Sequence, residues 1–431
     1  MKTIPITDVV IPDFRQRKTF DEAAMAEFAD NIAKTQLQNA IVLRADNTLV
    51  SGERRLRAIR DLAGLEISIK HDGEEVPLGC IPYTRLESLD PLAAEEAELD
   101  ENLHRVNLTW QERAAAHSRL QSLRIAQAIA RGESPPTVAD IATELRGSAI
   151  GDYQTITKQE LILAKHLDRP EIAGATSPKE AFKILKKLED TERNRIHGES
   201  IGRTYSSDAL RCLNTDSLAW MKECPAEQFD VILTDPPYGM GADEFGDSGG
   251  LAQGAHGYAD TADFAMKCFT TLATEGFRIT KPQAHIYAFC DIELFPVWKK
   301  LFELEGWWVF RTPLIWHKPA AMRAPWPEHG PQRKYEVCLY AVKGKRPVLK
   351  MAPDLFAYSP DTNLGHAAQK PVALFEDLLK RSVNAGDSIL DPFCGSGPIF
   401  PAAFGLKCKA TGIEQDTASY GIAVKRIATL K

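Results

Sequence analysis

The stretch VILTDPPYGMG, residues 231–241, runs four strand-forming residues into an acid, two prolines, a tyrosine and two glycines. An apolar run followed by Pro and Gly is typical of a buried strand that ends in a turn. Pro236 and Pro237 fix the backbone and lack N–H groups, so the Asp235 carboxylate and the Pro236 carbonyl can face one exocyclic amine as two acceptors. Tyr238 offers an aromatic face on which a base can stack. A proline-rich turn that only closes a strand is the alternative.

A second turn, DPFCGSG at residues 391–397, follows the strand-like SIL and precedes a helical pattern. Gly395 and Gly397 allow a tight turn and the close approach of a ligand, although many such turns serve packing alone. Glu414 ends the next strand-like segment, KATGIE, where an acid can accept hydrogen bonds from ribose hydroxyls. Together the turn and the acid predict a cofactor that contains adenosine.

From about residue 205 apolar strands alternate with helical patterns, which predicts βαβ units and a largely parallel sheet. Ligands of such open sheets bind outside the carboxyl ends of the strands, where both turns fall. We therefore expect residues 205–431 to form one α/β domain with a largely parallel sheet.

The preceding half of the chain has a different texture. Residues 1–130 contain short extended runs and helical patterns, which predict a small α+β domain. Residues 131–197 follow the chain-breaking GESPP, and within them residues 137–166 read as helix, Gly-containing turn and helix, with Thr137 as a cap. This segment resembles a helix-turn-helix, followed by a helical linker.

Composition sets limits on the class of protein. A chain of 431 residues with 44% hydrophobic and 26% charged residues is expected to fold into two or three globular domains. No run of about 18 apolar residues predicts a membrane span, and the N-terminus does not resemble a secretory signal, so we expect a cytoplasmic protein. The eight scattered cysteines predict reduced thiols and no zinc knuckle, and no metal site is expected.

The formal net charge of −7 argues against a nucleic-acid partner, but one segment is an exception. Residues 307–350 hold nine Lys or Arg against two Glu, among six Trp or Tyr. Core strands and a solvated face are one interpretation. The other is that the loop at 317–336 tracks phosphates and wedges into DNA, with the Gly-rich segment 246–257 closing over a base. The candidate DNA-binding residues are Lys318, Arg323, Trp326, Arg333 and Lys334.

Residues 205–431 resemble the S-adenosylmethionine-dependent DNA amino-methyltransferases in the order called the beta class, where a DPPY element precedes an F-x-G-x-G element. Pro398 and Ile399 depart from the threonines frequent in that family, and GHAAQKP replaces the commoner HPTQKP. The resemblance implies a Rossmann-like sheet that is mostly parallel and has one antiparallel strand. It implies catalysis by Asp235, Pro236, Pro237 and Tyr238. It implies cofactor binding by Asp216, Lys370, Pro371, Asp391, Phe393, Gly395, Gly397 and Glu414.

The activity that this resemblance implies is methylation of the N6 amine of an adenine flipped out of double-stranded DNA. Cytosine N4 methylation is the alternative within the enzymes, although its members usually carry Ser in place of Asp235. A partition or regulatory protein whose C-terminal domain only senses cofactor is a rival of another class. No nucleophilic Cys is implied, so Cys394 is expected to be a packing residue. A restriction partner and a phage or mobile-element origin are left open.

Two motifs of the N-terminal half, VSGERRLRAIRDLAG and ENLHRVNLTWQERA, resemble those of the ParB-like domain. By that resemblance CTP with magnesium would bind in a site lined by Gly52, Glu53, Arg54, Arg55, Glu101, Asn102 and Arg105. A helix start decorated by charges is the alternative. The single chain leaves open whether this ParB-like domain binds a nucleotide. It also leaves open whether the protein is a homodimer.

Overall fold

The computed structural model describes residues 1–11, 22–85, 92, 95, 99, 108–147, 150–237, 261–319, 334–359 and 369–430. The chain divides into two compact units, Met1–Leu185 and Lys186–Lys431. The boundary falls inside the long helix α8 (Pro178–Ile201). Each unit is described separately.

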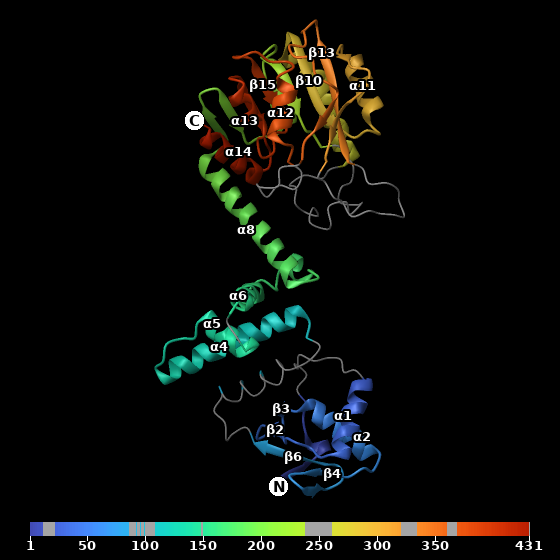
Figure 1. Cartoon of the computed structure of the whole chain (residues 1–431), viewed down its shortest axis with the longest axis vertical. Helices are drawn as coiled ribbons and strands as arrows, with labels where there is room; N and C mark the ends of the chain where they lie inside the picture. The colour runs from blue at the N-terminus through green and yellow to red at the C-terminus, as the bar shows by residue number, and fades with distance from the viewer. Residues whose placement is uncertain are drawn as a thin grey trace. The chain divides into compact units, whose positions relative to one another are not determined.

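The second unit is built on a single sheet of ten strands within the described residues (Figure 1). The order is β14-β12-β13-β10-β9-β15-β16-β8-β7, and β11 also pairs with β13. The strand bounds are β7 (Thr204–Ser207), β8 (Leu210–Leu213), β9 (Phe229–Thr234), β10 (Thr280–Cys290), β11 (Trp308–Val309), β12 (Leu314–His317), β13 (Tyr335–Lys343), β14 (Leu355–Ala357), β15 (Ser388–Asp391) and β16 (Lys409–Ile413).

The five neighbouring strands β10, β9, β15, β16 and β8 are parallel, as predicted. The expected antiparallel strand is β13, which lies between β10 and β12. The sequence prediction missed a second reversed strand, β7 at the sheet edge. It forms a hairpin with β8 through Asp208, whose φ is 43°, and so short a connection can join only antiparallel strands.

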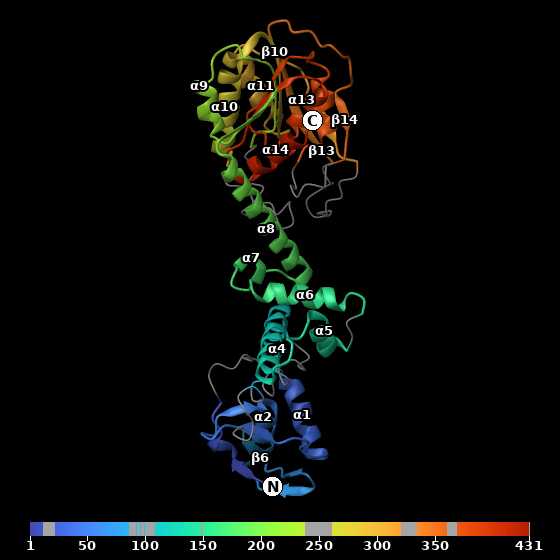
Figure 2. The same ribbon diagram turned by 90° about the vertical axis from the view of Figure 1, so that its left-hand side faces the viewer.

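Among the described residues, three helices cover each face of this sheet. Helices α9 (Ser217–Glu223), α10 (Ala262–Ile279) and α11 (Phe295–Leu304) bury their apolar sides on one face, and α12 (Val372–Leu379), α13 (Ile399–Gly405) and α14 (Thr417–Thr429) on the other. Figure 2 shows α9, α10 and α11 on one side of the sheet and α13 and α14 on the opposite side. Alternate residues of β9 enter the two cores, Val231 and Leu233 one and Ile232 the other. This double burial explains the continuous apolar run before Asp235.

The strand order places the two turns side by side. From β9 the chain crosses to β10 on one side, and from β15 it crosses to β16 on the other, while β9 and β15 pair directly. A sheet whose order reverses in this way opens a crevice at the carboxyl ends of the two central strands. Asp235 follows β9, and Asp391 is the last residue of β15.

The first unit begins with a small α+β fold, as predicted. Its four-stranded sheet has the order β1-β6-β2-β3 and mixed directions, with a separate hairpin of β4 and β5. The bounds are β1 (Thr3–Pro5), a 3-10 turn (Ile6–Asp8), α1 (Glu22–Lys34), β2 (Ile41–Leu43), β3 (Leu49–Ser51), α2 (Glu53–Gly64), β4 (Ile69–His71), β5 (Glu74–Val76) and β6 (Cys80–Arg85). Fully buried Ile41, Leu43, Leu56 and Ile81 form the centre of its core.

The rest of the first unit is helical: α4 (Trp110–Arg131), α5 (Val138–Arg146), α6 (Tyr153–Ala164), α7 (Pro170–Ala173) and the start of α8. The predicted helix-turn-helix corresponds to α5 and α6. Thr137 caps α5 as expected, because its side chain accepts from the Asp140 N–H while the Asp140 carboxylate accepts from the Thr137 N–H. Buried Glu160 on α6 bonds His117 of α4 and Arg146 of α5, which ties the three helices together.

Candidate active site

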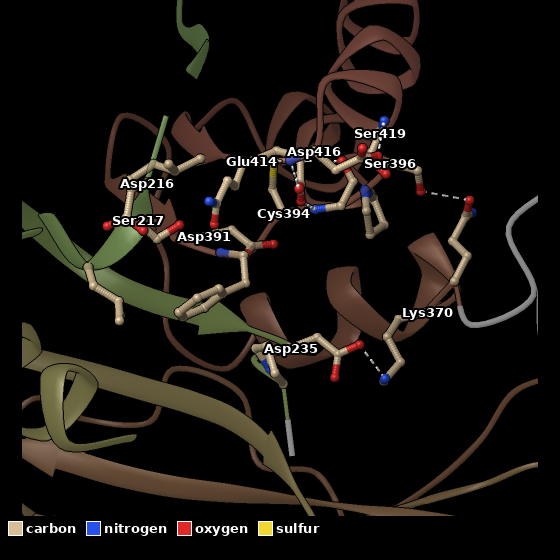
Figure 3. A pocket seen from close by; sticks show the side chains of 18 of the residues that line it. Asp216, Ser217, Asp235, Lys370, Asp391, Cys394, Ser396, Glu414, Asp416 and Ser419 are labelled. Carbon is tan, nitrogen blue, oxygen red and sulfur yellow. Dashed lines mark hydrogen bonds and ion pairs between the residues drawn. The ribbon is translucent and has the colours of Figure 1, made fainter. Parts of the chain in front are cut away.

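A pocket lies at the carboxyl ends of β8, β9, β15 and β16, where the topology predicts a ligand (Figure 3). Its walls come from the starts of α9 and α14, the Gly-rich turn and the segment before α12. The sequence-predicted residues that line it are Asp216, Asp235, Pro237, Lys370, Asp391, Phe393, Gly395 and Glu414. Pro236, Pro371 and Gly397 adjoin the pocket without lining it.

The Gly-rich turn is shaped by its two glycines, as predicted. Gly395 and Gly397 have φ values of 52° and 74°, in the left-handed region that glycine enters most readily. A Cβ on Gly397 would lie 2.6 Å from the ring of Phe400 and 3.0 Å from Ala423. The turn therefore lies directly on α13 and α14, and it leaves its other side open to the pocket.

Two buried acids form the floor of the pocket. Glu414 accepts hydrogen bonds from the N–H groups of Gly395, at 2.8 Å, and Asp416, at 2.7 Å. Burial raises the pKa of Glu414 to about 7, although these two hydrogen bonds act to lower it. Asp391 accepts from the Thr234 hydroxyl at 2.8 Å and the Phe393 N–H at 3.2 Å. Burial raises its pKa to about 8, with the nearby Asp235 and Glu414 carboxylates adding to the shift.

Two more acids mark helix starts at the rim. Asp216 caps α9 by accepting from the Ala219 N–H, and Asp416 caps α14 by accepting from the Ser419 N–H. The pocket thus gathers acceptor oxygens, which suit ribose hydroxyls and a cationic group. That chemistry fits S-adenosylmethionine, whose sulfonium is positive.

Sequence reasoning missed Gln369. Its side chain is buried, and its Oε1 accepts from the Ser396 hydroxyl at 2.9 Å and from Arg426 at 3.0 Å. These two donors fix the orientation of the amide. Among the described residues its Nε2 has no hydrogen-bond partner, and Gln369 lines the pocket. Its signal in the sequence was its place beside Lys370 in AAQKP.

Asp235 lies at the end of β9 and accepts a hydrogen bond from the Lys370 ammonium, the contact drawn in Figure 3. Lys370 Nζ also lies 3.0 Å from Glu336 Oε2 on β13. The other oxygen of Glu336 accepts from Lys318, just beyond β12. Glu336 was not predicted as a site residue, because its place beside Lys370 arises only from the sheet order.

Several predicted residues lie outside the part of the chain that the structure describes: Tyr238, Arg323, Trp326, Arg333, the segment 246–257, Glu101, Asn102 and Arg105. Lys318 and Lys334 are described and meet through the bond from the Lys318 N–H to the Lys334 carbonyl, at 2.8 Å. Cys394 is buried in the pocket wall, and burial raises the pKa of its thiol well above the usual value. Its surroundings suit a packing residue.

The predicted nucleotide site can be placed only in part. Gly52 precedes α2, and buried Glu53 accepts from Arg57 one turn later. Arg55 donates to the carbonyl of Ala40, at 2.6 Å, which braces the start of β2. Arg54 lies over the Phe28 ring at 4.8 Å, and its Nε is buried without a hydrogen-bond partner among the described residues.

No described helix is long and apolar enough to span a membrane. No cluster of three or more described His, Cys, Asp or Glu side chains is arranged to hold a metal ion.

An open α/β sheet with a Gly-rich turn and an acid after the adjoining strand is the class of fold that binds its ligand at the carboxyl ends of the strands, where the DPP segment also lies. The sequence model of the DNA methylase family, which comprises N6 and N4 enzymes, matches residues 229–425, and that of the ParB N-terminal domain matches residues 1–73. The chain therefore carries a domain of the DNA methylase family in its C-terminal part and a ParB N-terminal domain at residues 1–73.

Three curated relatives each match about half of the chain. The type II methyltransferase M.HpaI of Haemophilus parainfluenzae is 23% identical over 241 residues, 50% of this chain and 74% of the relative. The DNA adenine methyltransferase YhdJ of Escherichia coli (strain K12) is 24% identical over 264 residues, 52% of this chain and 84% of the relative. A nucleoid occlusion protein of Geobacillus thermodenitrificans is 29% identical over 205 residues, 45% of this chain and 65% of the relative.

Proposed function

We propose that this protein transfers the methyl group of S-adenosylmethionine to the N6 amine of an adenine rotated out of a DNA duplex. One observation carries the proposal: Asp235, the acid of the DPP segment, lines the same pocket as the Gly-rich turn and Glu414. An acceptor for the amine and the expected cofactor site are therefore within one cavity. The adenine methyltransferase YhdJ among the relatives supports the choice of base.

The cofactor would be held through its polar groups. Glu414 accepts from the ribose hydroxyls, while the Gly-rich turn lets the backbone approach the ligand. Asp216 follows β8, beside the strand that ends before Glu414, where an acceptor can meet the amine of the cofactor's adenine ring. The buried Nε2 of Gln369 supplies a donor for an oxygen of the ligand. The cofactor supplies a methyl group on a positively charged sulfur.

Asp235 and the Pro236 carbonyl would then each accept a hydrogen bond from the N6 amine of the adenine. These bonds turn the nitrogen lone pair away from conjugation with the ring and toward the methyl group. When the methyl group passes from the sulfonium to the nitrogen, the nitrogen would release a proton, which the Asp235 carboxylate beside it would accept and pass to solvent. Positioning of the two reactants provides most of the rate enhancement.

The product decides between the two reactions of this family. Nucleoside mass spectrometry of DNA methylated by the purified protein should show N6-methyladenine, because Asp235 stands where cytosine enzymes usually have Ser. Finding N4-methylcytosine alone would show that the protein is a cytosine N4 methyltransferase. The absence of any methylated base with DNA of all sequence contexts would favour a binding protein that senses cofactor.

The role of Asp235 can be tested separately from cofactor binding. Asp235→Ala removes the acceptor for the amine, so we expect methyl transfer to fall by at least about 100-fold. The dissociation constant for S-adenosylmethionine, measured by titration calorimetry, should change little, since the cofactor lies mainly on the β15 and β16 side. Asp354→Ala, which removes an exposed acid before β14, serves as the control. Undiminished transfer by Asp235→Ala would disprove the assignment.

DNA is the partner that both domains imply. We infer that cations of the 317–336 segment contact phosphates beside the pocket, since Lys318 already lies next to the charged cluster around Asp235. The helices α5 and α6 would add affinity from the N-terminal unit. We also propose a nucleotide site near Arg54, because Gly52 precedes α2 there and the buried Arg54 Nε has no hydrogen-bond partner among the described residues.

A further inference from the structure

Lys370 lies between two carboxylates that belong to different strands. Asp235 follows β9 and Glu336 is on β13, and the strand between them is β10. The Lys370 ammonium spans this gap above the ring of Phe289 on β10, at 4.9 Å from its centroid. It bonds Asp235 Oδ2 on one side and lies 3.0 Å from Glu336 Oε2 on the other.

The cluster is held in its charged form. The Lys370 side chain is only 5% exposed, and a buried ammonium needs paired carboxylates to remain stable. Burial opposes its charge, but Asp235 and Glu336 outweigh burial and raise the pKa of Lys370. Burial likewise opposes the charge of Glu336, and Lys370 and Lys318 outweigh it and lower its pKa to about 2. Four charges of alternating sign thus extend from Asp235 to Lys318.

We propose that Lys370 is a positioning residue for Asp235 and that Glu336 is required for this role. The inference rests on the proposed function and adds to it. An aspartate rotates easily about its last torsion, whose preferences are broad. The ammonium holds the carboxylate through Oδ2 and so restricts the rotation of the group that is to accept from the amine of the base.

Glu336 controls how strongly Lys370 acts on Asp235. An ammonium paired with one carboxylate alone would direct all its charge onto Asp235 and weaken that group as an acceptor for the amine. Glu336 shares the ammonium, and Lys318 occupies the other oxygen of Glu336, so the four-residue cluster is neutral. Asp235 therefore keeps its orientation without losing its acceptor strength.

This role differs from the cofactor contact that the family resemblance implied for Lys370. The ammonium is directed at Asp235 and Glu336, and in Figure 3 it lies on the Asp235 side of the pocket, across from Glu414 and Asp416. A cofactor residue would affect binding of S-adenosylmethionine. A positioning residue acts on turnover at saturating cofactor.

The experiment compares Lys370→Met, Lys370→Arg and Glu336→Gln in the full-length protein, with kcat and the dissociation constant for S-adenosylmethionine measured on each. We expect Lys370→Met to lower kcat roughly 10- to 100-fold, the scale of a misplaced catalytic group, and Lys370→Arg to recover part of the loss. Glu336→Gln keeps the shape of the side chain and should also lower kcat. Cofactor affinity should stay within about threefold, far less than the change in kcat.

A second Lys–Asp pair, at the other end of β9 from Asp235, provides a matched control. Lys281 bonds Asp230 at 2.7 Å near the opposite end of β9, so Lys281→Met removes a Lys–Asp pair away from the pocket and should leave kcat unchanged. Thermal unfolding of each variant identifies loss of fold, and if Lys370→Met does not fold, the result for Glu336→Gln decides.

Two outcomes overturn the proposal. One is weaker cofactor binding by Lys370→Met with unchanged kcat at saturation, which would make Lys370 a cofactor residue. The other is unchanged kcat in Glu336→Gln. The wild-type protein in the same assay tests the proposed function independently, because its product identifies the methylated base whatever the variants do.

Discussion

At the scale of single residues, the acids of the pocket show what a motif can and cannot predict. The sequence placed Glu414 beside a ligand because it ends an apolar strand, and the family resemblance placed Asp391 there. The sequence could not show that both would be buried within one cavity, since that depends on β9, β15 and β16 ending side by side. Burial is also the first cause of their raised pKa values.

These raised pKa values predict that cofactor binding releases protons. Near pH 7 part of Glu414 and much of Asp391 are protonated, and a bound sulfonium favours the ionised forms, so protons leave as the cation binds. Affinity should therefore fall as the pH is lowered from about 8 to 6. The same shifts make the folded protein bind more protons than the unfolded chain, so these groups lower the free energy of unfolding as pH rises from about 4 to 8.

Titration calorimetry in two buffers of different ionisation enthalpy measures the released protons directly. Glu414→Gln cannot titrate, so the release near pH 7 should decrease in that variant. Glu376→Gln removes an acid of α12 outside the pocket and should leave the release unchanged. Binding without proton release in the wild-type protein would contradict the assigned pKa values.

Glu336 was missed for a different reason. In KYEVCLYAV it reads as a polar residue at the start of a strand, and nothing in the local pattern relates it to DPPY a hundred residues earlier. Its partner Lys370 comes from a third segment. Only the order β13-β10-β9 brings the three together, and strand order is not encoded in periodicity.

At the scale of elements, local signals predicted most of the structure. The helix at Thr137 begins where its capping box indicates. The strands that lead into DPPY and DPFCGSG coincide with the apolar runs and end where those runs end. The edge strand β7 was missed because TYSS is short and polar, so its pairing with β8 depends on the hairpin rather than on its own pattern.

Two glycine-to-alanine substitutions separate the effect of close packing in the Gly-rich turn from the effect of a positive φ. Gly397→Ala places a methyl group 2.6 Å from Phe400, a fully buried side chain that cannot move aside. Gly386→Ala also puts alanine at positive φ, 90°, but meets no atom within 4 Å. The conformational cost is about 1 kcal/mol in both, so only Gly397→Ala should distort the turn.

We expect Gly397→Ala to weaken S-adenosylmethionine binding at least about tenfold, equivalent to about 1.4 kcal/mol. Gly386→Ala should bind like the wild-type protein. Calorimetric titration of both variants provides the measurement, with thermal unfolding as the check on folding. Equal affinities in the two variants would mean that the turn tolerates a side chain and does not hold the cofactor closely.

At the scale of the whole molecule, the division into units does not coincide with the ends of helices. The second half of α8 packs against α14 through two small residues. A Cβ on Gly198 would lie 2.4 Å from the Thr417 carbonyl oxygen, and one on Gly421 would lie 2.2 Å from that of Asn194. Lys425 also donates to the Asn194 side chain at 2.7 Å. This end of α8 is therefore part of the methyltransferase unit.

The two units can be separated to find which one reads the DNA sequence. A chain of residues 186–431 keeps the contacts of α8 with α14, whereas one of residues 205–431 lacks them and should unfold at a lower temperature. Because the pocket and the segment 317–336 are both within residues 186–431, we expect that chain to methylate the same motif as the full-length protein. Loss of α5 and α6 should weaken DNA binding, which fluorescence anisotropy measures.

Modification-sensitive sequencing of DNA methylated by each chain compares the motifs. Arg323→Ala with Arg333→Ala should impair methylation even in the full-length protein, since these cations belong to the segment expected to contact phosphates beside the base. A different or relaxed motif in the 186–431 chain would instead show that the helix-turn-helix reads bases. The N-terminal unit would then determine where the enzyme acts, and the methyltransferase unit would supply only the chemistry.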